Sequence, residues 1–277
     1  MAKIGFSLQS SYVQPMPEVL NMLAGLGVHA VSPLWQQNQS MEDLVNHAVR
    51  CGLTIQSLHG PLRGLADLWD PDENHSRLIL QHLLQSVDDC ASLDIPVLVV
   101  HSWTGLQYTF SRETLFFDNF DRLVSYAGEQ GVQIAFENLE GPEYLSALMD
   151  RYTGIPSVGF CWDSGHELCY TPDQDFLTLY GDRLLMTHLN DNLGITHPDG
   201  LLQGTDDLHL LPFDGMTDWT QTVTRLKQAR HQDILNFEFK IRPKGDRCTH
   251  DLYSQIPLEQ YLTNAYIQSS KVAALYE

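Results

Sequence analysis

The chain has 277 residues, 43% of them hydrophobic, with 35 acidic against 16 basic residues and a net charge of −19. A chain of this length can bury about three quarters of its unfolded surface in one core, so we expect a single domain over residues 1–277. The negative charge repels phosphodiester backbones, so we expect no nucleic acid partner.

The sequence has no apolar run of about 18 residues or more, and its start, MAKIGFSLQS, leads into a strand-like segment without the apolar stretch of a secretory signal. Five cysteines without a CxxC pair argue against a disulfide framework and a structural zinc knuckle. We therefore expect a cytoplasmic protein without a membrane partner. The sequence leaves open whether it forms a homo-oligomer.

Short apolar runs alternate with segments of helical spacing along the whole chain. Eight runs are typical of buried parallel strands, over residues 3–8, 28–32, 54–59, 96–101, 132–137, 157–163, 183–189 and 234–239. Helical spacing occurs over residues 17–25, 41–51, 75–93, 111–130, 218–230 and 258–274. Eight such units predict an α/β fold closed as a (β/α)8 TIM barrel, although an open doubly wound sheet gives similar local patterns.

Long stretches without a regular pattern follow four of the expected strands, over residues 60–74, 102–110, 190–217 and 240–257. In a barrel, loops that follow strands lie at the C-terminal face. Long connections there commonly form substrate walls and lids. We therefore expect the functional site at this face.

A histidine or an acid stands at the C-terminal end of six expected strands. These residues are His59, His101, Glu137, Asp163, His188 and Glu238. In a barrel all six would face one mouth, where barrel sites lie. Three carboxylates that share a cavity with imidazoles need raised pKa values or a cation. Their mixed oxygen and nitrogen donors suit one divalent ion, such as Mn, Mg, Co or Zn, better than a thiolate-preferring ion.

Basic residues cluster once, after the last expected strand, at Lys240, Arg242, Lys244 and Arg247. Barrel enzymes often hold a substrate phosphate near the loops after strands seven and eight, so we predict that Lys240 and Arg242 contact a phosphorylated or carboxylated small substrate. A solvated loop or a subunit contact is the alternative. Trp103, just beyond a strand end, is either an apolar wall for a sugar ring or core filler.

The strings FEN, WDSGH, HLNDN, DLHLLPFDGMTDW and NFEF follow one another at the ends of expected strands five to eight. In this order they resemble the xylose-isomerase-like TIM-barrel superfamily, which includes sugar-phosphate isomerases, ketose epimerases, inosose dehydratases and zinc apurinic endonucleases. The resemblance implies four metal ligands, which are Glu137, Asp163, His188 and Glu238. It also implies that Glu137 and Glu238 form the acid/base pair.

The same resemblance implies roles for further polar residues. Three histidines, His59, His101 and His166, match substrate-contacting positions, and Asp207 and His209 match possible additional metal ligands. The tract departs from the family at Phe213, where glycine is common. If this position requires a positive φ, a bulky aromatic costs about 1 kcal/mol or more, so we expect the loop to be reshaped here.

The resemblance implies an enzyme, a divalent-metal-dependent isomerase or epimerase acting on a small sugar, a sugar phosphate or a hydroxy-carbonyl compound by proton transfer beside the carbonyl. A metal-dependent lyase that dehydrates a polyol or a keto acid begins with the same step and is the first alternative. A phosphodiesterase with up to three zinc ions is another, because nine residues correspond to the ligands of the endonuclease branch, but the acidic charge opposes it. The last alternative is a barrel that binds a sugar without converting it.

Overall fold

The computed structural model describes residues 2–9, 12–37, 39–245 and 247–277. The strands found there are β1 (Lys3–Ser7), β2 (Ala30–Ser32), β3 (Thr54–Ile55), β4 (Leu58–His59), β5 (Val97–His101), β6 (Gln133–Glu137), β7 (Val158–Asp163), β8 (Leu184–His188) and β9 (Ile234–Phe237). They form two parallel sheets with the strand orders β3-β2-β1-β9 and β4-β5-β6-β7-β8.

The two sheets join at both edges and close into one barrel. A parallel bridge between Leu34 and His59 links them on one side, and a bridge between Leu189 and Phe237 links them on the other. β3 and β4 are the two halves of the single strand expected over residues 54–59. The closed ring of parallel strands confirms the TIM barrel and excludes the open doubly wound sheet.

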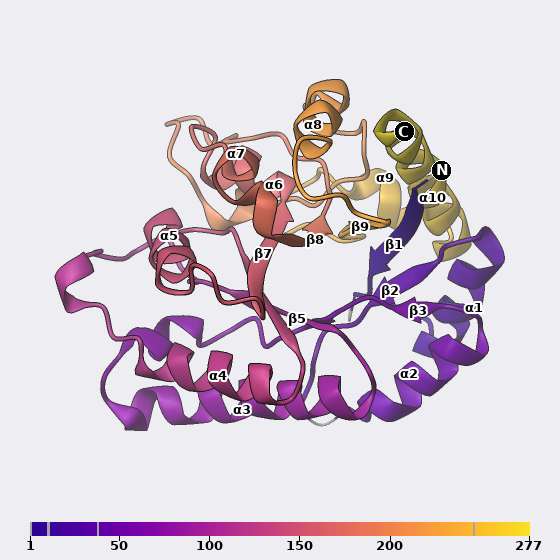
Figure 1. Cartoon of the computed structure of the whole chain (residues 1–277). Helices are drawn as coiled ribbons and strands as arrows, with labels where there is room; N and C mark the ends of the chain where they lie inside the picture. Colours follow the sequence, from indigo (N-terminus) through magenta and orange to yellow (C-terminus); the bar gives the residue numbers. More distant parts are fainter. Residues whose placement is uncertain (1, 10–11, 38, 246) are drawn as a thin grey trace.

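Helices surround the strands (Figure 1). The α-helices in the described ranges are α1 (Met16–Leu26), α2 (Met41–Arg50), α3 (Glu73–Ser92), α4 (Asp118–Glu129), α5 (Pro142–Arg151), α6 (Ser164–Tyr170), α7 (Phe176–Tyr180), α8 (Trp219–Leu226), α9 (Asp251–Ser254) and α10 (Leu258–Tyr276). The last helix, α10, contacts the first strand, β1, so the outer layer closes beside them.

None of the helices that the structure describes is long and apolar enough to cross a membrane.

Two expected helices are shorter than predicted. The helix expected over residues 111–130 begins at Asp118, after a single 3-10 turn at Arg112–Thr114, and α8 ends at Leu226. α5 was not predicted, although it has a recognisable start, because Gly141 takes a φ of 67° directly before Pro142 in the first turn.

The barrel interior is filled by small and medium side chains of adjacent strands, which are Val97, Val99, Ala135, Cys161 and Met186. Burial raises the pKa of the Cys161 thiol to about 12. The thiol therefore stays protonated at neutral pH, and Cys161 serves as packing beneath the mouth.

Candidate active site and metal centre

Strand register places the predicted polar residues at one level of the barrel. β5 and β6 pair so that His101 lies beside Glu137, and β7 and β8 pair so that Asp163 lies beside His188. Each of these residues is the last of its strand. Because the strands are parallel, their C-terminal side chains converge at one mouth.

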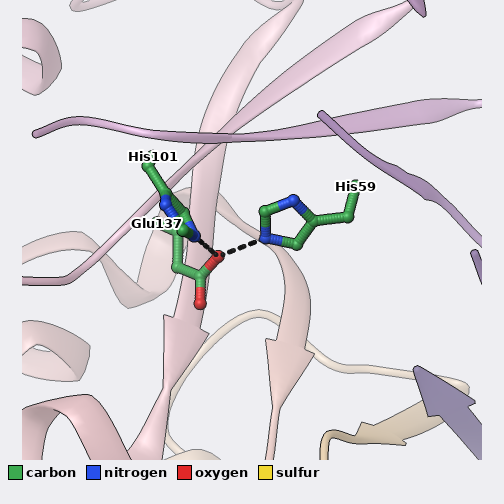
Figure 2. A group of neighbouring side chains, drawn as sticks. All are labelled: His59, His101 and Glu137. Carbon is green, nitrogen blue, oxygen red and sulfur yellow. Dashed lines mark hydrogen bonds and ion pairs between the residues drawn. The ribbon is translucent and has the colours of Figure 1, made fainter. Parts of the chain in front are cut away.

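Glu137 lies at the centre of this mouth. Its Oε2 lies 3.2 Å from Nε2 of His59 and 3.4 Å from Nε2 of His101 (Figure 2). Its Oε1 lies 3.0 Å from Nδ1 of His188 and 3.4 Å from Nδ1 of His166. Burial disfavours the carboxylate, but the surrounding imidazoles hold the pKa of Glu137 well below its usual range. Glu137 is therefore an ionised carboxylate covered by four rings.

Glu238 shares a histidine with Glu137 but is open to solvent. Nδ1 of His188 lies 2.9 Å from Oε2 of Glu238 and 3.0 Å from Oε1 of Glu137. The Glu238 side chain is 21% exposed and lines a cavity of about 310 Å³, whereas the Glu137 side chain is 1% exposed. Two carboxylates that face one nitrogen at these distances need a proton or a cation between them.

Asp163 completes a set of donors that fits a divalent ion. Ligand atoms of Glu137, Asp163, His188 and Glu238 all lie within 4.8 Å of one another. Asp163 is fully buried, and burial raises the pKa of its carboxyl group. A divalent cation would offset three clustered carboxylates, and carboxylates with an imidazole form a donor set that Mn, Co and Zn accept. The four residues therefore fit the predicted metal.

Asp207 forms a second polar group beside this set, and its charge is already balanced. Its Oδ1 lies 2.8 Å from Nε2 of His209 and 3.4 Å from Nε2 of His166. Its Oδ2 lies 3.2 Å from Nζ of Lys240 and also accepts a hydrogen bond from Nζ of Lys244. Burial acts against ionisation, but His209 and Lys240 hold the pKa of Asp207 well below its usual range.

The loop that carries Asp207 is held by a buried carboxylate that sequence patterns did not assign. Asp191 accepts hydrogen bonds from the backbone N–H of Phe213 at 2.8 Å, the backbone N–H of Thr217 at 3.0 Å and the indole N–H of Trp219 at 3.2 Å. Gly215 allows this approach, because a Cβ there would lie 2.3 Å from Oδ1 of Asp191. The string HLNDN contains Asp191, but its role depends on the loop conformation.

The backbone of this loop is strained at two residues. Phe213 has a φ of 73° and His209 a φ of 52°, both in the left-handed region that favours glycine. The sequence predicts a reshaped loop at Phe213, whereas the structure has a positive φ at this residue, so the strain is present. The hydrogen bond from Phe213 to Asp191 helps to hold this conformation.

Two asparagines orient Asp163 and were also not assigned from sequence. Nδ2 of Asn190 donates to both carboxylate oxygens of Asp163, at 3.0 and 3.1 Å. Asn138 accepts from the backbone N–H of Asp163 at 2.8 Å and donates to its carbonyl at 2.9 Å. A side chain at Gly165 would collide with Asn190, since its Cβ would lie 1.8 Å from Oδ1. Asn138, in the string FEN, and Asn190, in the string HLNDN, follow the ends of β6 and β8, the strands on either side of β7, which carries Asp163.

Only some of the residues predicted to contact the substrate line the cavity. Lys240 and Arg242 line the cavity beside Glu238, together with His59. Trp103 is not part of the described cavity lining, because its ring stacks on Tyr144 with centroids 4.2 Å apart and planes 7° apart. Its predicted role as a substrate wall therefore has no support from this cavity.

The sequence and the fold resemble a known class of barrels. Residues 20–255 match the family model of the xylose isomerase-like TIM barrel, and the chain therefore belongs to this family. A protein of Sinorhizobium fredii called uncharacterized protein y4fM is 34% identical over 169 residues, which cover 56% of this chain and 51% of that protein. The match thus spans about half the length of that relative.

Solved structures share the fold along nearly the whole chain. An IolI protein with a bound zinc atom has a TM-score of 0.77 at 18% identity, with 99% of each chain covered. A D-psicose 3-epimerase with D-fructose has a TM-score of 0.71 at 12% identity, with 99% of each covered. The 3-keto-D-glucoside 4-epimerase YcjR of E. coli has a TM-score of 0.70 at 14% identity, with 98% of this chain and 100% of that chain covered.

Proposed function

We propose that the chain is a metal-dependent isomerase or epimerase that moves a proton on the carbon beside the carbonyl of a small sugar or sugar phosphate. The observation that carries the proposal is the pair of carboxylates, Glu137 and Glu238, that converge on one nitrogen of His188 beside a cavity. The cavity volume of about 310 Å³ suits a small molecule. Several proteins of similar fold are named as sugar epimerases, among them the D-psicose 3-epimerase and the 3-keto-D-glucoside 4-epimerase.

Four residues would hold one divalent ion, namely Glu137, Asp163, His188 and Glu238. When bound, the ion would supply positive charge beside the carbonyl and hydroxyl oxygens of the substrate, which favours negative charge developing on them. Asn190 fixes both oxygens of Asp163 by hydrogen bonds, so that this ligand is oriented in advance.

Glu238 is the carboxylate that the cavity reaches, and we assign it the first proton transfer. Glu137 lies beneath four imidazoles, so its access to the substrate is narrower, and it is the second member of the pair. Bases on two faces of the substrate give epimerisation, whereas one base on a single face gives 1,2-isomerisation. His59 also lines the cavity and is placed to orient a substrate hydroxyl.

The lyase alternative needs a proton donor for the leaving hydroxyl, in addition to the same first step. His101 and His166 are the candidates, but neither belongs to the described lining of the cavity, so we place the lyase second. The phosphodiesterase alternative would use Asp207 as a further ligand. Lys240 and Lys244 already pair with its Oδ2, which opposes a second ion there.

Deuterium exchange from D₂O tests the proposal. The protein is treated with a chelator, reloaded with Mn²⁺ and incubated with ketoses and ketose phosphates, and the products are followed by NMR and mass spectrometry. We expect deuterium beside the carbonyl with the reloaded protein only. Loss of water from the substrate would identify a lyase instead, and the absence of exchange into every compound would contradict the proposal.

A further inference from the structure

The cavity beside Glu238 has a strongly basic rim in an acidic protein. Lys240, Arg242 and Lys244 all line it, on the loop that follows β9. Glu238 is the one acid among its described lining residues. The chain as a whole has a net charge of −19, so three cations at one cavity are a local departure from the charge of the rest of the protein.

The three cations are not equivalent, because two of them already have a buried partner. Nζ of Lys240 lies 3.2 Å from Oδ2 of Asp207, and Nζ of Lys244 pairs with the same oxygen. Asp207 is almost fully buried, so leaving its carboxylate without a cation would be costly, and the two lysines are held there. Within residues 2–9, 12–37, 39–245 and 247–277, Arg242 makes no ion pair, and its side chain is exposed.

Apart from Glu238, the described lining of the cavity offers Arg242 no anionic side chain. Leu34, Leu62 and Phe239 form apolar walls, which suit the carbon skeleton of a small ligand but give no hydrogen bond to a charged group. The guanidinium group is a planar fork of N–H donors that matches a phosphate or a carboxylate with two parallel hydrogen bonds. An exposed guanidinium beside the proton-transfer carboxylate is therefore suited to bind part of the substrate.

We propose that Arg242 is a specificity-determining residue that binds an oxyanion on the substrate, at the end remote from the reacting carbonyl. This inference rests on the proposed function. The oxyanion is a phosphate ester or a carboxylate. Lys240 and Lys244 fix the loop through Asp207 rather than binding the ligand directly. The substrate class is accordingly a ketose phosphate or a keto sugar acid, not a neutral ketose.

Three related compounds test this inference by isothermal titration calorimetry on the Mn²⁺-loaded protein. D-fructose, D-fructose 6-phosphate and D-fructuronate share a six-carbon keto skeleton and differ in the group at the end remote from the ketone. We expect at least one of the two anions to bind about ten to a hundred times more tightly than D-fructose. Preference for the 6-phosphate assigns the site to phosphate esters, and preference for the uronate assigns it to carboxylates.

Two variants, each of which removes one arginine, show whether the preference for the anion depends on Arg242. Arg242→Ala should remove the preference for the anion, so that neither anion binds more tightly than D-fructose. Arg77→Ala, at an exposed position on α3, should retain the preference. Equal Kd values for the three compounds, or a preference that survives in Arg242→Ala, would overturn the inference. Deuterium exchange into D-fructose with no preference for an anion would leave the proposed function intact and refute only the role of Arg242.

Discussion

The two sheets of the barrel end differently at the same mouth. All five strands of one sheet, β4 to β8, end in a histidine or an acid, in the order His59, His101, Glu137, Asp163 and His188. In the other sheet, β1 ends at Ser7 and β2 at Ser32, and the cavity opens against these two residues. We call the part of the mouth formed by the ends of β4 to β8 the charged half. In the other half, the small serine side chains leave room for the cavity.

This difference follows from what each half must satisfy. Buried carboxylates are stable only beside cations or donors, so one charged strand end requires others next to it. Small hydroxyl side chains can bond to one another and leave volume above them, as Ser57 does by donating to Ser32 at 3.0 Å. Glu238 directly follows β9, at the edge where the two sheets join. Glu238 therefore lies beside the buried acids and histidines and also lines the cavity. For this reason we assign it the proton transfer.

The largest expected effect is a contrast between variants of Glu238 and Glu137, the two central carboxylates. Glu238→Gln should lower the rate of deuterium exchange by about 10² to 10⁴, because the group that moves the proton is lost, while metal stays bound or is only weakened. Glu137→Gln should instead lose metal, because it removes the charge around which four imidazoles are arranged. Exchange rates and metal content of both variants check this contrast. Near-normal exchange in Glu238→Gln would show that Glu238, the more exposed of the two carboxylates, does not move the proton.

A smaller effect should come from the side chain that supports the charged half. Asn190→Ala removes the donor to both oxygens of Asp163 and should weaken metal binding by about 10- to 100-fold. Asn119→Ala is the matched control, since Asn119 is also buried and donates one hydrogen bond, but to the carbonyl of Leu68 away from the mouth. Titration with Mn²⁺ after chelator treatment measures both affinities. Equal affinities in the two variants would mean that Asp163 needs no such support.

The smallest effect should come from the strained loop at the mouth. Phe213→Gly removes a side chain that is 44% exposed and relieves a φ of 73°, so it should raise the free energy of unfolding by up to about 1 kcal/mol. Leu201→Gly, at an exposed loop residue without a positive φ, should give no gain. Denaturant unfolding of the two variants compares them. A loss of stability in Phe213→Gly would mean that its contact with Trp219 outweighs the strain.

The charged half was largely predictable from sequence, because parallel strands place their last residues together whatever the loops do. Asp163 and His188 could be assigned to one site from strand positions alone, and the structure brings them side by side. The pairing of Lys240 and Lys244 with Asp207 could not be foreseen, since it spans 33 and 37 residues and depends on two irregular loops. α6 was missed because Asp163 ends β7 and caps the helix at once, so no turn signal separates the two.

Metal stoichiometry tests the central claim most directly, namely that the charged half holds one divalent ion. Elemental analysis is made on protein purified without chelator, beside His188→Ala purified in the same way. We predict one equivalent of a divalent ion per chain in the wild type and its loss in the variant. No metal in the wild type, or three equivalents that survive in His188→Ala, would contradict the account.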